Sequence, residues 1–137
     1  NNGYDIQYSG KNNNYRLRDP DLYFQDAVTW SKISSGTFSA RYMPVGCLFD
    51  IAGCCIFCLK NLSSYVLGLL NSSVAKEMLE LISPTLNYEV DHLKKIPVII
   101  SDNPSNIQIR VESCLAISKE SWNSFETSWD FQKHPMI

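Results

Sequence analysis

Long hydrophobic runs and histidines are what this sequence lacks most clearly. No apolar stretch reaches the roughly 20 residues that cross a bilayer, so we expect no membrane span. The two histidines have no partner at a metal-ligand spacing, and there is neither an HExxH motif nor a glycine-rich phosphate loop. An excess of positive charge is missing as well. Twelve basic and 14 acidic residues give a net charge of −2, which argues against a stand-alone nucleic-acid binder.

The start of the chain also lacks the features of a targeting segment. Residues 1–14 are polar and asparagine-rich, with no initiator methionine and no apolar stretch of the signal-peptide kind. We therefore expect an irregular lead-in to an excised piece of a longer cytoplasmic protein. The whole chain, with 137 residues of which 45% are hydrophobic, is large enough for one core.

The five cysteines are an odd and unevenly distributed set. Four of them fall between residues 47 and 58, which favours reduced thiols in a cytosol over a disulfide framework. Cys55 and Cys58 have the two-residue spacing of redox and zinc sites. Their apolar, strand-like flanks and the missing second pair favour buried structural cysteines, and a thiol or metal site is the weaker alternative.

The segment from residue 64 to residue 100 carries the strongest pattern in the chain. Apolar residues recur every four positions, which predicts helices with one buried face formed by Val66, Leu70, Val74, Met78 and Ile82. Residues 71–73 cap helices well, so we expect two helices that meet near Ser72, the second ending at Ser83-Pro84. A short strand at 86–90, a helical turn at 91–95 and an apolar run at 96–100 follow.

Alternating patterns upstream predict a small mixed or antiparallel sheet. Residues 28–34 and 38–42 read as a hairpin around a three-residue turn, with Phe38, Ala40 and Tyr42 on its buried face and Arg41 outside. Further strands are expected at 45–51 and 54–59. Sheet, hairpin and several packed helices together define an α+β fold.

A last helix should begin at Asn103-Pro104, since asparagine caps well and proline suits the first helical position. Its expected apolar stripe comprises Ile107, Val111, Cys114 and Leu115. Three aromatic residues, Trp122, Phe125 and Trp129, follow at spacings of three and four. They are typical of core packing and equally of a surface that docks another protein.

Hydroxyl and basic side chains gather on the predicted hairpin. Residues 28–60 hold three basic residues and one acidic residue, a local positive excess. Hydroxyls, lysine and arginine are groups that contact phosphates and base edges, although a solvated hairpin has the same composition. The residues we favour for binding DNA are Ser31, Lys32, Ser34, Arg41 and Tyr42, with Arg16, Arg18 and Lys60 as phosphate contacts.

Ordered motifs from about residue 15 to the end resemble one family, the BREX or phage-growth-limitation adenine-specific DNA methyltransferases of bacteria. They are TWSKISS at 29–35, FSxRY at 38–42, FDxxGCxIF at 49–57, LGLLNS at 67–72, PTLNY at 84–88, IPV at 96–98 and WNSFETSWDF at 122–131. The leucine-rich Leu-Asn-Ser helix followed by Ile-Pro also resembles target-recognition domains of restriction specificity subunits.

The resemblance implies a target-recognition domain at 15–100, with residues 101–137 as a C-terminal helical segment packed on it. Its partner would be double-stranded DNA. A separate methyltransferase domain of the same parent chain would bind S-adenosylmethionine and methylate adenine in phage defence. The asparagine-proline-proline-aromatic motif of methyl transfer is incomplete at 103–105, so we expect no catalysis, cofactor or metal in this fragment. The alternative is a protein-docking module for other defence components that does not contact DNA.

Overall fold

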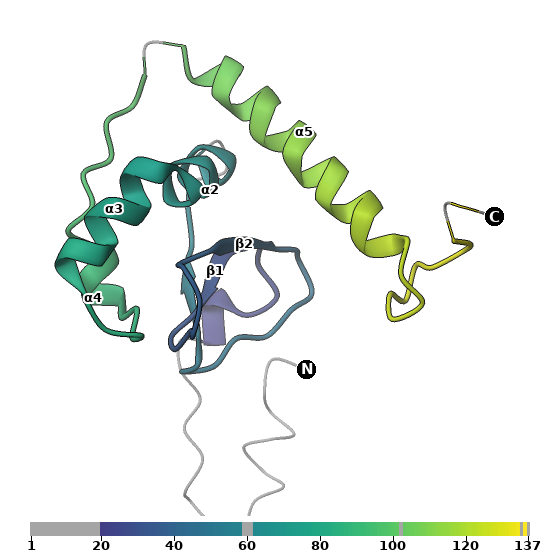
Figure 1. The fold of residues 1–137 in the computed structure, drawn as a ribbon, viewed down its shortest axis with the longest axis horizontal. Helices are drawn as coiled ribbons and strands as arrows, with labels where there is room; N and C mark the ends of the chain where they lie inside the picture. Colours follow the sequence, from purple (N-terminus) through teal and green to yellow (C-terminus); the bar gives the residue numbers. More distant parts are fainter. Residues whose placement is uncertain (1–19, 59–61, 102, 135, 137) are drawn as a thin grey trace, which may run out of the picture.

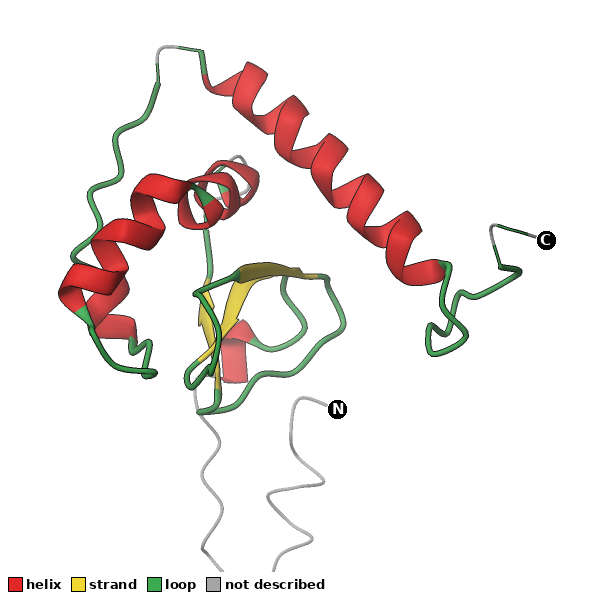
Figure 2. Ribbon diagram, viewed as in Figure 1, coloured by secondary structure: helices red, strands yellow, loops and turns green. Residues whose placement is uncertain are grey.

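The computed structural model describes residues 20–58, 62–101, 103–134 and 136 (Figure 1). Its secondary-structure elements follow this order: η1 (Pro20–Leu22), β1 (Ala27–Ser31), β2 (Ala40–Met43), β3 (Gly53–Ile56), α2 (Ser63–Asn71), α3 (Ser73–Ile82), α4 (Val90–Leu93) and α5 (Pro104–Asn123). The predicted α+β class is confirmed, with helices α2 to α4 beside a small sheet (Figure 2). None of the described helices combines the length and the apolar character that a membrane span requires.

The sheet has three antiparallel strands in the order β2-β1-β3, with β1 in the centre. The period of two in β1 sorts its side chains. Val28 and Trp30 are almost fully buried and point to the helices, whereas Thr29 and Ser31 belong to the opposite face. The indole nitrogen of Trp30 donates a hydrogen bond to the carbonyl oxygen of Tyr88 at 2.8 Å, which satisfies its one polar atom inside the core.

Helices α2 and α3 meet at the corner expected near Ser72. The Ser72 hydroxyl accepts a hydrogen bond from the backbone amide of Ala75 at 3.2 Å, so it caps α3. The buried face predicted for α3 is only partly right, because Met78 and Ile82 are half-buried, but Ala75 and Leu79 are fully buried and Val74 is 58% exposed. Ser72 is extended, with ψ at 153°, so the four-residue spacing of α2 does not continue across it.

Helix α5 begins at Pro104, as expected, and packs against α2 (Figure 1). At the contact a Cβ atom added to Gly68 would lie 2.7 Å from Cγ2 of Val111, so the helices approach too closely for a larger residue. Three of the four residues of the predicted stripe, Ile107, Val111 and Leu115, are half-buried, but Cys114 is exposed.

The link between β1 and β2 is longer than the expected three-residue turn. Strand β1 ends at Ser31. The residues that follow, 32–34, no longer pair with β2 and instead pair with residues 86–88. The backbone amide of Tyr88 donates to the carbonyl of Lys32 at 2.7 Å, and that of Ser34 donates to Leu86 at 3.0 Å. The strand expected at 86–90 is accordingly reduced to one isolated bridge, Ile33 to Asn87.

The strand predicted at 45–51 does not form. Gly46 has a φ of 93°, and a carboxylate oxygen of Asp50 accepts hydrogen bonds from the amides of Ala52 and Gly53. These turn features override the alternating pattern, and the side chains of Val45 and Ile51 are mainly exposed. The next predicted strand, at 54–59, forms in part as β3, which ends at Ile56; residue 59 lies outside the described residues.

Candidate nucleic-acid interface

Ser31 and Arg41 are joined by a side-chain hydrogen bond, and both belong to the described residues favoured for DNA binding. Arg41 in β2 lies opposite Thr29 of β1, so it shares a sheet face with Thr29 and Ser31. One guanidinium nitrogen of Arg41 donates a hydrogen bond to the Ser31 hydroxyl at 2.6 Å. Both residues are exposed, as the alternating pattern predicted for Arg41. The serine thus restrains an arginine that faces solvent.

The charge of Arg41 is not matched by a carboxylate in the part of the chain that the structure describes. The two ion pairs found there are Lys32 with Glu89 and Lys94 with Asp91, at 3.3 and 3.0 Å. A guanidinium carries five donors in a planar fork, of which Ser31 engages one nitrogen. Arg41 therefore keeps donors for an acceptor outside the protein.

Lys32 lies on the sheet face opposite to Ser31, where Glu89 pairs with it. Glu89 also precedes α4 as its N-cap residue: its backbone carbonyl accepts from the His92 amide at 3.0 Å, and the His92 ring accepts from the Glu89 amide at 3.3 Å. The lysine is therefore tied to the α4 side of the sheet and shares its charge with an acid. Its role in DNA binding stays a prediction.

Ser34 and Tyr42 are not brought together with Arg41. The hydroxyl of Ser34 accepts from the backbone amide of Gly36 at 3.3 Å within the β1–β2 link. Tyr42 lies opposite Val28 on the core-facing side of the sheet, at its edge, and is 42% exposed rather than buried as expected. Arg16, Arg18 and Lys60 lie outside the described residues.

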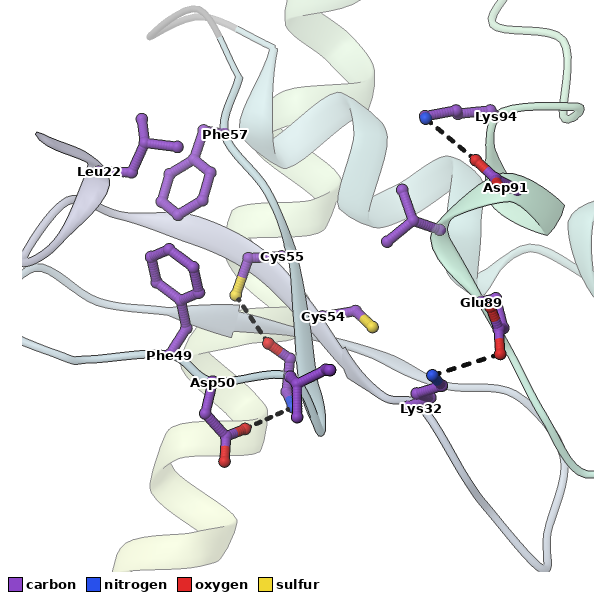
Figure 3. Close-up of a pocket in the computed structure, with 13 residues that line it drawn as sticks. Leu22, Lys32, Phe49, Asp50, Cys54, Cys55, Phe57, Glu89, Asp91 and Lys94 are labelled. Carbon is purple, nitrogen blue, oxygen red and sulfur yellow. Dashed lines mark hydrogen bonds and ion pairs between the residues drawn. The ribbon is translucent and has the colours of Figure 1, made fainter. Parts of the chain in front are cut away.

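A hollow of about 390 Å³ lies along β3 (Figure 3). Leu22, Phe49 and Phe57 line one end, and the Lys32–Glu89 and Asp91–Lys94 pairs line the other. The hydrogen bond from Lys94 holds the pKa of Asp91 below its ordinary value. This end of the hollow is thus charged but internally paired.

Three cysteines lie in β3 or just after it, and two of them, Cys54 and Cys55, line this hollow. Burial raises the pKa of the Cys54, Cys55 and Cys58 thiols above the ordinary value, which disfavours the reactive thiolate. The Cys55 thiol donates to the carbonyl of Gly53 at 3.4 Å. In the described part of the chain, no three His, Cys, Asp or Glu side chains gather in a way that could hold a metal ion.

Sequence reasoning missed Asn71, the last residue of α2. Its side-chain oxygen accepts from the backbone amide of Ala40 at 3.1 Å, and its side-chain nitrogen donates to the carbonyls of Ala40 and Leu67, both at 3.0 Å. The Leu-Asn-Ser motif was visible as a helix corner. The pairing of this asparagine with β2 depends on the tertiary fold.

Comparison with known proteins finds relatives that are similar to this chain in sequence. Over its whole length the chain is 39% identical to part of the adenine-specific methyltransferase BrxX from Escherichia coli O9:H4 (strain HS). The chain is similar to adenine-specific methyltransferases. Over 83% of its length it is also 39% identical to part of the adenine-specific methyltransferase PglX from Lacticaseibacillus casei (strain Zhang). The chain spans only 12% and 10% of these two relatives, and no family model matches it.

Proposed function

We propose that this chain is the sequence-recognition region of a bacterial adenine-specific DNA methyltransferase of a phage-defence system. Residues 15–100 would bind double-stranded DNA, and residues 101–137 would pack on them. Another domain of the same polypeptide would bind S-adenosylmethionine and transfer the methyl group, in the cytoplasm. The similarity to BrxX and PglX supports the family, and the exposed Arg41 restrained by Ser31 supports the role.

The chemistry of the parent reaction requires such a region. An enzyme that acts on an adenine within a duplex must take the base out of the stack, so other contacts must hold the DNA in register. These contacts need a rigid support. Arg41 belongs to a strand paired with β1, whose Val28 and Trp30 are anchored in the core.

Arg41 suits direct readout in the major groove. An arginine fork binds the O6 and N7 atoms of guanine through two parallel hydrogen bonds. The Ser31 hydroxyl orients this fork in advance, which reduces the side-chain entropy lost on binding. The net charge of −2 is compatible with this role if the catalytic domain supplies most of the attraction to phosphates.

Replacing Arg41 tests this assignment in the complete polypeptide. We expect Arg41→Ala to weaken binding to the methylated target by about 1–3 kcal/mol, the typical value of a bidentate arginine–guanine contact. Arg41→Lys keeps the charge without the fork and should restore non-specific binding only. Unchanged affinity and methylation in both variants would remove Arg41 from the interface.

Exposed aromatic residues support a second candidate, a protein-docking module that does not touch DNA. Trp122, Phe125 and Trp129 are 60%, 57% and 102% exposed, so packing within the described residues does not account for them. Grafting residues 15–100 from a relative with a different target separates the two functions. A changed methylation sequence supports sequence recognition by residues 15–100, whereas an unchanged methylation sequence supports the protein-docking function.

A further inference from the structure

We infer that residues 33–39, which follow Lys32 in the link between β1 and β2, enter a groove of the DNA and that Asn71 is the positioning residue that fixes this reading segment. The inference rests on the proposed function and goes further, because it assigns the segment that reads bases and the side chain that holds it. Asn71 itself need not touch DNA.

The reading segment has the chemistry of a groove contact. Gly36 is exposed, and the exposed hydroxyl residues are Ser35, Thr37 and Ser39; the segment carries no charged side chain. A hydroxyl can donate or accept, so these residues can match either type of group on a base edge. Ile33 is 68% exposed beside them, and an apolar side chain of this kind suits the methyl group of thymine.

The first half of the reading segment is fixed by backbone pairing. Residues 32–34 exchange hydrogen bonds with residues 86–88 at 2.7 and 3.0 Å, and Ile33 forms a bridge with Asn87. The Lys32–Glu89 ion pair ties the same place to the start of α4. The segment thus leaves the sheet along a defined path.

Its second half is fixed by a buried ring. Phe38 is only 3% exposed and packs edge-on against Tyr88, with ring centroids 5.1 Å apart. The Trp30 ring lies near the same ring in a tilted arrangement, at a centroid distance of 6.4 Å. Because Phe38 interrupts an otherwise exposed run, it pins the segment to the core two residues before β2 begins.

Asn71 fixes the point at which the reading segment becomes β2. Its amide bonds both the N–H and the C=O of Ala40, as a neighbouring strand would on the open edge of the sheet. A third hydrogen bond, to Leu67, ties the same amide to α2. Loss of this side chain would leave two part-buried backbone groups without a protein partner.

The two hydrogen bonds between Asn71 and Ala40, called the Ala40 clamp below, lie where a change would affect DNA recognition. Ala40 stands directly between Ser39 of the reading segment and Arg41, so a shift of Ala40 moves both. Groups that read a ligand have to be held within about 0.5 Å of their productive positions. We therefore expect Asn71 to act on specificity through residues 33–41 rather than through a contact of its own.

The experiment compares Asn71→Ala with a matched control in the complete polypeptide. Ser72→Ala removes the α3 cap next door, so it also lowers stability but leaves the Ala40 clamp intact. Hydrogen exchange of residues 33–41 without DNA measures how firmly the Ala40 clamp holds this segment. Binding to a duplex with the methylated target and to a duplex without it measures specificity, and thermal unfolding measures stability.

We expect Asn71→Ala to speed exchange in residues 33–41 and to lower the ratio of target to non-target affinity by about tenfold, within the range of one base contact. Ser72→Ala should lower the unfolding temperature similarly and leave that ratio unchanged. Thr37→Val, which removes only an exposed hydroxyl, should lower the ratio without changing exchange. It provides the test if Asn71→Ala does not fold.

Two outcomes would overturn the inference and separate it from the proposed function. If exchange rises but the ratio holds, and Thr37→Val also has no effect while Arg41→Ala weakens binding, residues 33–39 are not the reading segment. If Arg41→Ala and the graft of residues 15–100 change nothing either, the DNA-reading function itself fails.

Discussion

The part of the chain that holds the sheet with α2 to α4 and the part formed by α5 differ in where they keep apolar side chains. In the first part Trp30, Leu79 and Val28 are almost fully buried in one cluster. In α5, a helix of 20 residues, no residue is fully buried, and Ile109 and Ile117 are more than 60% exposed. The first part therefore has a core, whereas the second packs onto it through half-buried residues such as Val111 and Leu115 and contacts α2.

The largest effect should come from the core of the first part. Trp30→Ala removes a side chain that is 1% exposed, so we expect a loss of about 3–5 kcal/mol in the free energy of unfolding. Urea denaturation followed by circular dichroism measures it. A loss below about 1 kcal/mol, the range of ordinary surface changes, would mean that the core does not depend on this residue.

A smaller effect is expected at the joint between the two parts. Gly68→Ala places a Cβ atom against Val111, whose branched side chain has little freedom to move, and should cost about 1–3 kcal/mol. Hydrogen exchange should then rise in α5 and stay unchanged in β1.

The double variant Gly68→Ala with Val111→Ala is the control for this joint. It removes the clash and keeps the better helix propensity of alanine, so protection of α5 should return. If α5 loses protection equally in the double variant, the Gly68 contact is not what holds it.

Thiol reactivity compares the two parts without unfolding either. The pKa values of Cys54, Cys55 and Cys58 are raised by burial, whereas Cys114 is exposed on α5. Raised pKa values disfavour the reactive thiolate of the first three at pH 8, and Cys114 is open to the reagent, so we expect iodoacetamide to modify Cys114 faster than the other three. The difference between the modification rates should narrow as the pH rises, because more thiolate then forms at Cys54, Cys55 and Cys58. Equal rates at pH 8 would contradict this contrast.

The smallest effect is expected at the end of the second part. Trp129 is fully exposed, so Trp129→Ser should change the free energy of unfolding by no more than about 0.5 kcal/mol. Urea denaturation of this variant beside Trp30→Ala contrasts two residues of one type. A loss comparable to that of Trp30→Ala would show that the second part shares the core.

Local chemistry made the helices predictable. Ser72 and Pro104 mark helix starts through groups within a few residues of the helix, so their positions could be predicted from sequence. Strands depend on partners elsewhere. Residues 32–34 continue the pattern of β1 but pair with 86–88, and the predicted strand at 45–51 gives way to the turn at Asp50.

The candidate site likewise has features that local sequence predicts and features that depend on distant partners. Alternation placed Arg41 on the outer face of the sheet, and this prediction is confirmed. Its contact with Ser31 depends on the register of β1 against β2. The predicted three-residue turn was shorter than the real link, so the sequence did not indicate this register. The Lys32–Glu89 pair and the Ala40 clamp join residues far apart in sequence, so no local pattern indicated them.

The close approach at Gly68 has a consequence for how such regions are recombined. An exchange of residues 15–100 between relatives moves α2 but leaves α5 of the recipient in place. Only a donor with a residue as small as glycine at this position would seat the recipient's Val111. Whether regions of two relatives can be combined should therefore depend on the residues at positions 68 and 111. Recombination between relatives should keep these two positions together.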